Sequence, residues 1–327
     1  LEFSSIVSFD LREEKGDVGV THILSDTATV YASSHSLTLG SRSTLTGDKS
    51  DELKTLLHRF QLDPKSKIPV YTGTNTVKGY LLNQFSMSED RDVLRVATTD
   101  AWGAAAGSAS QSYVWTFDAT KPDLPLLGSV GGLGKGERIY AVRFAGPRAF
   151  VVTFRQIDPL YVIDLKDPKN LSLKGELKIP GFSTYLHILD EDHLIGLGRG
   201  TDGRGLQLSL FDVSNSSDPK AIQQLEIGGQ GTVSEALAAH HAFTFDRRRN
   251  LLVLPIDSYA GDKGGYHLYD VSIPTGFRLR ETIQSKRGLR SIVIGERDAA
   301  HLITINEEGI QLYRLDPSLA VVGKVGW

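Results

Sequence analysis

IYAVRFAGPRAFVVTFRQIDPLYVIDLKDPKNLSLKGELKI, the stretch from Ile139 to Ile179, decides the fold. It contains four short apolar runs. A Gly-Pro pair separates the first two runs, and an Asp-Pro pair separates the third from the fourth. Pro fixes φ and Asp hydrogen-bonds its own backbone, so both pairs are typical of turns. The stretch therefore predicts four consecutive antiparallel strands.

The same unit recurs along the chain. The next unit has apolar runs in the same order, at Thr184–Leu189, His193–Leu197, Leu206–Val213 and Ala221–Ile227. An aromatic or aliphatic residue is followed by Asp once in each unit, at Asp10, Asp63, Asp118, Asp164, Asp212, Asp270 and Asp316. A spacing of roughly 50 residues matches a propeller blade and is longer than the helical repeats of about 33 or 34 residues. The sequence therefore predicts an all-β fold, a β-propeller of four-stranded antiparallel blades.

The repeat predicts about seven blades, six complete and one partial, in a single domain over residues 1–327. Residues 1–25 supply only the third and fourth strands of a blade, and we expect its first two strands upstream of Leu1. The complete blades are expected at approximately 26–75, 76–132, 133–180, 181–230, 231–285 and 286–327. Apolar residues at helical spacing in Asp51–Arg59 are compatible with one short helix between strands.

Composition excludes several classes of protein. The formal net charge is -3, so we expect no nucleic-acid partner. The chain has no Cys, which excludes disulfides, thiolate nucleophiles and Cys-ligated metals. No run approaches the roughly 20 apolar residues that span a bilayer, so no membrane span is expected. The basic run Arg247–Arg249 lies between two expected strands and is interpreted as a charged hairpin tip.

Several collinear motifs between Val77 and Ile256 go beyond generic propeller patterning. They are GYLLNQFS (79–86), LRVATT (94–99), AFVVTFR (149–155), DPLYVIDL (158–165), KIPGFS (178–183), YLH (185–187) and SLFDV (209–213). This part of the chain resembles a family of secreted prokaryotic proteins with a C-terminal β-propeller domain distantly related to WD repeats. The resemblance implies a propeller and a secreted or extracellular location, but no catalytic residues. Where that family tends to have Asp-His-Lys-Ala-Phe, this chain has Ala239-His240-His241-Ala242-Phe243.

Polar residues on the expected innermost strands are candidates for a site in the central channel. They are Asn83, Arg143, His187, His240, His241 and Arg290. Side chains alternate along a strand, so His240 and His241 are expected to point to opposite faces. A polar ring of this kind can hold a metal, an anion or ordered water. The alternative is that these residues hydrogen-bond to one another and to channel water.

Two metal sites follow from these residue types. His187 and His241 could form a two-His transition-metal site completed by oxygen ligands. Asp190 and Asp192 lie on an acidic turn, and oxygen-rich loops bind calcium in extracellular proteins. The alternative for Asp190 and Asp192 is a solvated turn, because Asp is favoured there for local reasons. No cofactor is identified, and calcium is favoured over a transition metal.

Two functions remain open at this point. The first is an extracellular, non-enzymatic binding or scaffold propeller whose partner is a protein, peptide or glycan at the cell exterior. The second is a metal-dependent hydrolase or lyase with its site in the central channel, around His187, His240 or His241. No nucleophile elbow is present and no Gly-rich loop leads into a helix, so the sequence favours the binding function.

Overall fold

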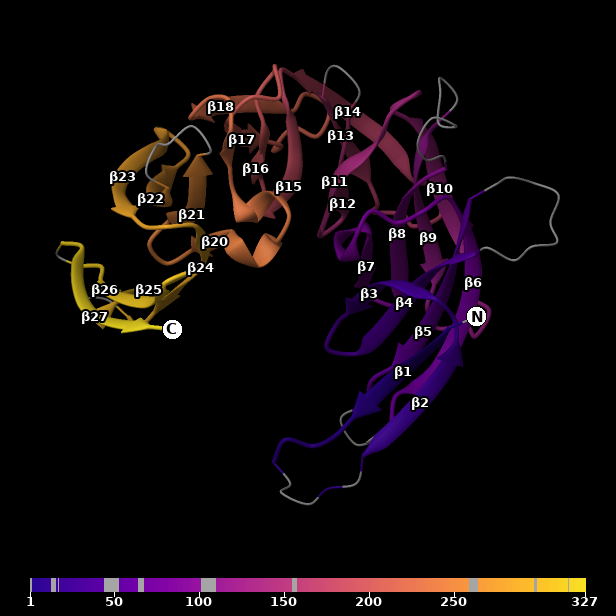
Figure 1. The fold of residues 1–327 in the computed structure, drawn as a ribbon. Helices are drawn as coiled ribbons and strands as arrows, with labels where there is room; N and C mark the ends of the chain where they lie inside the picture. The colour runs from indigo at the N-terminus through magenta and orange to yellow at the C-terminus, as the bar shows by residue number, and fades with distance from the viewer. Residues whose placement is uncertain are drawn as a thin grey trace. The chain divides into compact units, whose positions relative to one another are not determined.

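A computed structural model describes residues 2–12, 16, 18–43, 53–63, 68–100, 110–154, 158–258, 264–296, 299–316 and 318–327 (Figure 1). The chain divides into two compact units, Leu1–Glu176 and Leu177–Trp327, and each is described by itself. The single domain over residues 1–327 therefore stays a prediction.

The first unit contains one two-stranded sheet and three four-stranded sheets. Their strand orders are β1-β2, β3-β4-β5-β6, β10-β9-β8-β7 and β11-β12-β13-β14. The elements, the last of which extends past Glu176, are β1 (Phe3–Ser8), β2 (Gly19–Leu24), β3 (Thr27–Ala32), β4 (Ser36–Ser43), β5 (Lys54–Gln61), β6 (Val70–Lys78), η1 (Gln84–Ser86), β7 (Met87–Asp90), β8 (Val93–Thr99), β9 (Ser112–Asp118), β10 (Leu126–Leu133), β11 (Arg138–Ala145), β12 (Arg148–Phe154), β13 (Asp158–Asp164) and β14 (Ser172–Ile179).

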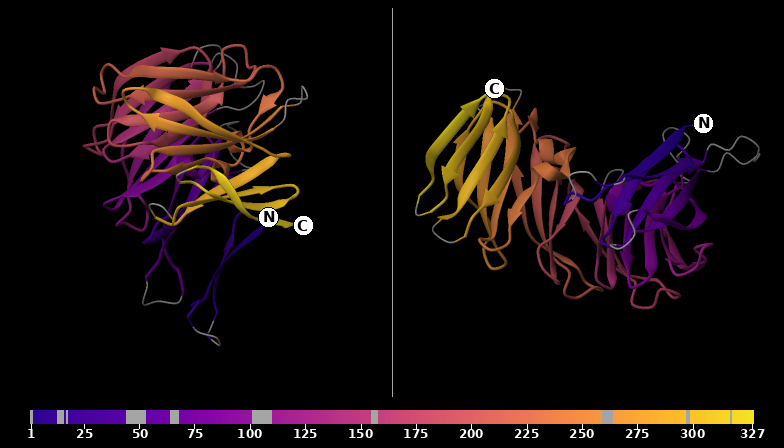
Figure 2. Two further views of the ribbon diagram at one scale, coloured as in Figure 1. Left: turned by 90° about the vertical axis from the view of Figure 1, so that its left-hand side faces the viewer. Right: turned by 90° about the horizontal axis from the view of Figure 1, so that it is seen from below.

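The second unit contains three sheets. Their orders are β15-β16-β17-β18, β19-β21-β22-β23 with β20 also paired to β21, and β24-β25-β26-β27, the last at the yellow end of the chain in Figure 2. The elements are β15 (Phe182–Ile188), β16 (His193–Arg199), β17 (Leu206–Asp212), β18 (Lys220–Ile227), β19 (Thr232–Val233), η3 (Glu235–Leu237), η4 (His240–Ala242), β20 (Thr244–Asp246), β21 (Leu251–Ser258), β22 (Gly265–Ser272), β23 (Gly276–Gln284), β24 (Gly288–Ile294), β25 (His301–Asn306), β26 (Gly309–Arg314) and β27 (Ala320–Gly326).

The described residues confirm the all-β propeller architecture, with six complete blades and a partial, two-stranded one at the N-terminal end. The sheet of β19–β23 has a fifth strand because its first strand is divided. β19 and β20 both pair with β21, and the two 3₁₀ turns η3 and η4 lie between them. The segment between β19 and β20 carries His240 and His241 on η4.

The cores lie between neighbouring sheets. The middle strands are apolar on both faces, as in β12, where Phe150 and Val151 are fully buried. In the first unit Leu57 of β5 packs in one cluster with Phe117 of β9. In the second unit Leu208 of β17 shares a cluster with Leu254 of β21. Burial between sheets on both faces explains why these runs are continuous rather than alternating.

The short helix considered for Asp51–Arg59 is wrong over its described part, because Lys54–Gln61 is strand β5. Buried Thr55, Leu57 and Arg59 alternate with half-buried residues along it. Both edges of β5 are hydrogen-bonded, to β4 and to β6. Two full ladders of backbone hydrogen bonds outweigh a short coincidence of helical spacing. Residues 51 and 52 lie outside the described residues.

Candidate functional site

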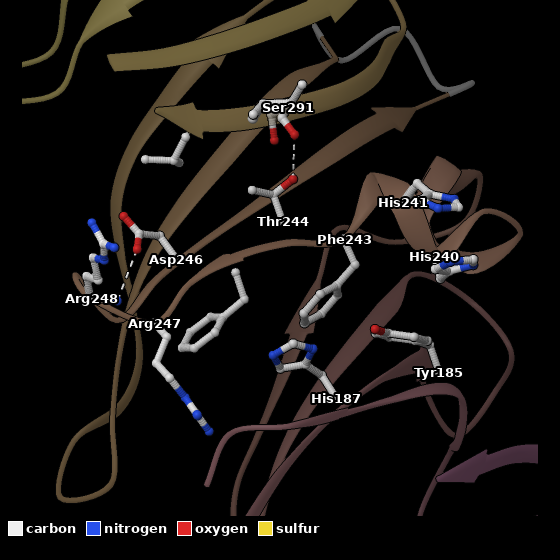
Figure 3. Close-up of a pocket in the computed structure, with 13 residues that line it drawn as sticks. Tyr185, His187, His240, His241, Phe243, Thr244, Asp246, Arg247, Arg248 and Ser291 are labelled. Carbon is white, nitrogen blue, oxygen red and sulfur yellow. Dashed lines mark hydrogen bonds between the residues drawn. The ribbon is translucent and has the colours of Figure 1, made fainter. Parts of the chain in front are cut away.

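A pocket of about 610 Å³ opens in the second unit, where β15, η4, β20 and β24 come together (Figure 3). This volume is in the range of small-molecule sites. Its lining consists of Tyr185, His187, His240, His241, Phe243, Thr244, Phe245, Asp246, Arg247, Arg248, Ser291, Ile292 and Val293. Three of the six channel candidates, His187, His240 and His241, therefore meet in one pocket.

Strand β15 supplies two of the rings. Tyr185 and His187 are two residues apart and so share a face of the strand. The pairing of β15 with β16 shifts register between Ser183 and Tyr185, and such irregularities re-aim side chains. At Gly198 of β16 an added Cβ would lie 1.7 Å from the main-chain oxygen of Phe182, so the close approach of the two strands requires glycine.

An aromatic cluster forms one wall of the pocket. The His187 ring lies 5.1 Å from the Phe243 ring and 5.3 Å from the Phe245 ring, measured between centroids. Tyr185 lies 5.0 Å from Phe243. Phe243 is buried, whereas Tyr185, His187 and Phe245 are half-buried. The wall therefore presents ring surface to an incoming ligand, and the imidazole and the phenol add polar atoms to it.

His240 and His241 do not point to opposite faces of a strand, and that expectation is wrong. Both lie on the 3₁₀ turn η4, and their ring centroids are 3.9 Å apart at an interplanar angle of 37° (Figure 3). The amide of Ala242 donates to the oxygen of Ala239 (2.9 Å) and that of Phe243 to the oxygen of His240 (3.1 Å). These turn hydrogen bonds replace strand geometry, so both imidazoles line the pocket.

Charged side chains form the rim. Arg248 pairs with Glu296 at 2.5 Å, and Asp246 accepts hydrogen bonds from the Arg248 amide (3.0 Å) and from Arg249 (2.7 Å). Arg247 donates to the main-chain oxygen of Leu189 (2.6 Å). Within the described residues Arg247 has no carboxylate partner, so its charge is not paired at the rim.

The remaining channel candidates lie elsewhere. Asn83 and Arg143 belong to the first unit, where Asn83 caps η1 by accepting from the Phe85 amide (3.0 Å) and Arg143 lies 4.1 Å over the Phe85 ring. Arg290 is exposed on β24 and does not line the pocket. Asn83 and Arg143 therefore both contact Phe85 in the first unit, whereas the three histidines and Arg290 belong to the second unit.

The two metal proposals stay predictions. The described residues contain no group of three or more His, Asp or Glu side chains placed to hold a metal ion. His187 and His241 line the same pocket. On the acidic turn Asp190 accepts from the Asp192 amide (2.8 Å) and lies 2.8 Å from Nδ1 of His193, contacts that the turn itself accounts for.

Sequence reasoning missed ten of the thirteen lining residues, among them Tyr185, Phe243, Phe245 and Arg247. The period of two along a strand gave a signal for Tyr185, because it shares the face of His187. Arg247 was interpreted only as part of the hairpin tip, and it does follow β20 directly. The two Phe residues carry no local signal, since they meet His187 only after the sheets pack.

The repeated antiparallel sheets define the class of protein, a β-propeller. A family model described as a β-propeller domain matches residues 1–317, and the chain belongs to that family. Its fold is similar to those of the periplasmic gluconolactonase of Pseudomonas aeruginosa (TM-score 0.53, 11% identity, 99% of this chain and 96% of that chain) and Sqt1 from Chaetomium thermophilum (TM-score 0.56, 10% identity, 99% and 82%). At these identities the likeness shows the fold alone.

Two archaeal proteins are related in sequence. An uncharacterized protein of Archaeoglobus fulgidus is 38% identical over 260 residues, which cover 80% of this chain and 37% of that protein. An uncharacterized protein of Methanocaldococcus jannaschii is 43% identical over 185 residues, 56% of this chain and 28% of that protein. The chain thus spans only about a third of the length of these two relatives. Among the described residues, no helix has the length and apolar character needed to cross a membrane.

Proposed function

We propose that this chain is a non-enzymatic binding propeller that holds a protein, peptide or glycan partner at the cell exterior. The observation that carries the proposal is the aromatic wall of the second-unit pocket next to Arg247, a cation without a carboxylate partner in the described residues. Aromatic lining with a few oriented polar groups is typical of ligand sites. The extracellular location is supported by the resemblance of the sequence to secreted propeller proteins.

The lining favours a ligand with an apolar face and a carboxylate. The rings of Tyr185, His187 and Phe245 provide contact area for a ligand, and rigid side chains of this kind lose little conformational entropy on binding. The Arg247 guanidinium matches a carboxylate in shape and charge. Uronic-acid residues of glycans and acidic residues of peptides both have this combination.

A metal-dependent hydrolase or lyase is the second candidate function, because His187, His240 and His241 all line the pocket. The gluconolactonase among the structural neighbours shares the fold of this chain at 11% identity, which leaves lactone hydrolysis as one reaction to assay. Elemental analysis of the purified protein separates the two functions. Stoichiometric zinc or another transition metal, together with turnover that chelation abolishes, would replace the binding proposal with the enzymatic one.

The binding proposal is tested by calorimetry with two probes, a glucuronate oligosaccharide and a pentapeptide with a central Glu. We expect at least one probe to bind, and Arg247→Ala to weaken that binding by about tenfold, because a charge-assisted hydrogen bond contributes about 1.5–3 kcal/mol. Arg278→Ala is the matched control, since Arg278 is an exposed arginine of the same unit that does not line the pocket, and it should change the affinity much less. Equal losses in the two variants, or no binding of either probe, would contradict the proposal.

A further inference from the structure

A second pocket, of about 540 Å³, lies in the first unit between neighbouring sheets. One side is the β7–β8 turn and the start of β8, with Asp90, Arg91 and Arg95. The other side is the β11–β12 turn at Gly146 and the turn after β13 at Lys166. It belongs to the first unit and shares no residue with the aromatic pocket.

Arg95 is the buried centre of this pocket, with a side chain only 8% exposed. Its guanidinium donates to the main-chain oxygen of Gly146 (2.6 Å) and to Oγ of Ser88 (2.8 Å). Its Cζ lies 5.3 Å from the centroid of the Phe144 ring. Nε has no hydrogen-bond partner among the described residues. Two neutral oxygens therefore satisfy only part of a group that has five N–H donors.

Counter-charge for Arg95 is scarce. Among the described residues its carboxylate neighbour is Asp90, whose oxygen is 3.6 Å away on a side chain that is 47% exposed. Burial lowers the pKa of Arg95, and the charge of Asp90 opposes that shift. Taking a cation out of water is costly unless it is paired and hydrogen-bonded. The partners of Arg95 within the described residues thus compensate its buried charge only in part, and an anionic ligand would compensate it further.

Two more cations line the same pocket. Arg91 and Lys166 are exposed and, within the described residues, form no ion pair. Three cations therefore face one carboxylate, that of Asp90. Fields of one sign in a cleft with low-dielectric walls concentrate ions of the opposite sign.

We propose that this pocket is an oxyanion site, in which Arg95 binds a carboxylate or a phosphate while Arg91 and Lys166 hold it from the rim. A planar guanidinium presents a fork that fits either group, and the exposed rim cations supply charge without a desolvation cost. The volume admits a small molecule that carries the anion, rather than the bare ion only.

The test is titration of the intact chain with phosphate and, separately, with acetate, followed by NMR of the Gly146 amide at constant ionic strength. We expect saturable shifts with at least one anion, and none with chloride. Phosphate binding tighter than acetate identifies a phosphorylated ligand, and the reverse order identifies a carboxylate. Lys166→Glu and Arg91→Glu each reverse one exposed rim charge and should weaken binding by about tenfold or more.

Arg138→Glu provides the matched control, because Arg138 is exposed at the opposite end of β11 from the Gly146 turn. It changes the net charge of the chain by the same amount and should leave the affinity unchanged. Arg95→Lys keeps the charge but not the fork, and should also weaken binding. No saturable shift with either anion, or equal weakening by Arg138→Glu and Lys166→Glu, would overturn the proposal.

Discussion

Two arginines of the first unit are almost equally buried but have different partners. The Arg59 side chain on β5 is 7% exposed and that of Arg95 on β8 is 8% exposed. Arg59 meets both oxygens of Glu89, at 2.8 and 3.0 Å, and Thr72 at 3.0 Å. Arg95 meets a carbonyl and a hydroxyl, and its nearest carboxylate stands at 3.6 Å.

This difference in partners indicates that Arg59 has a structural role, whereas Arg95 belongs to the proposed oxyanion site. Glu89 lies on β7 and also accepts from Ser36 of β4 at 2.7 Å, so this ion pair joins the β3–β6 sheet to the β7–β10 sheet. The charge of Arg59 is fully compensated inside the unit. Arg95 joins the β7–β10 sheet to the β11–β12 turn without such compensation, and its pocket carries further positive charge.

The largest effect is expected for Glu89→Ala. It leaves Arg59 buried without a carboxylate, and breaking a buried pair from one side costs about 3–5 kcal/mol. Urea unfolding of the variant and of the wild type measures this loss. The double variant Glu89→Leu with Arg59→Met should recover much of the stability, because no unpaired charge is left. A loss below about 1 kcal/mol for Glu89→Ala, the size of an exposed pair, would contradict the contrast with Arg95.

A smaller loss of stability is expected for Arg95→Met. The substitution removes two hydrogen bonds, each of which contributes about 1 kcal/mol net to the free energy of unfolding. It leaves no buried carboxylate without its partner. It also removes a cation whose burial is poorly compensated. The same urea measurement, without phosphate in the buffer, should give a smaller loss than Glu89→Ala. A loss equal to or greater than that of Glu89→Ala would mean that Arg95 is a structural tie of the same kind.

The smallest effect concerns pH. Burial alone would raise the pKa of Glu89, but the hydrogen bonds from Arg59 and Ser36 and the charge of Arg59 outweigh it, so the pKa lies below its ordinary value of 4.5. A carboxylate with a depressed pKa in the folded state stabilises fully above its unfolded pKa, and the contribution is lost as pH falls through the folded value. Stability should therefore decline below about pH 4.5, and Glu89→Gln should flatten that decline when unfolding is measured between pH 3 and pH 6. An unchanged slope in Glu89→Gln would place the acid sensitivity elsewhere.

The fold could be predicted because its signals are local and repeated. Turn pairs such as Asp167-Pro168 and the apolar runs between them recur in each unit, and neither depends on how the sheets pack. The helix considered at Asp51–Arg59 shows the limit of this reasoning. Apolar residues fit helical spacing there, but pairing with β4 and β6 decides the outcome, and both strands lie outside that stretch.

The site could be predicted only in part. His187, His240 and His241 were recognised as polar residues near an expected channel, and they do line one pocket. Their geometry was not predictable, because the break in the strand between β19 and β20 depends on turn hydrogen bonds rather than on a recognisable motif. Likewise, the contact of His187 with Phe243 joins residues far apart in the sequence.

The proposed function requires that the aromatic pocket of the second unit binds the ligand. Its most direct test is NMR of the histidine rings during titration with the glucuronate oligosaccharide or the Glu pentapeptide, whichever binds more tightly by calorimetry. We expect the ring signals of His187, His240 and His241 to shift together and saturate, whereas the signals of His301, which lies outside the pocket, should not move. Saturable binding that leaves the three pocket histidines unchanged, or shifts His301 equally, would contradict the proposed function.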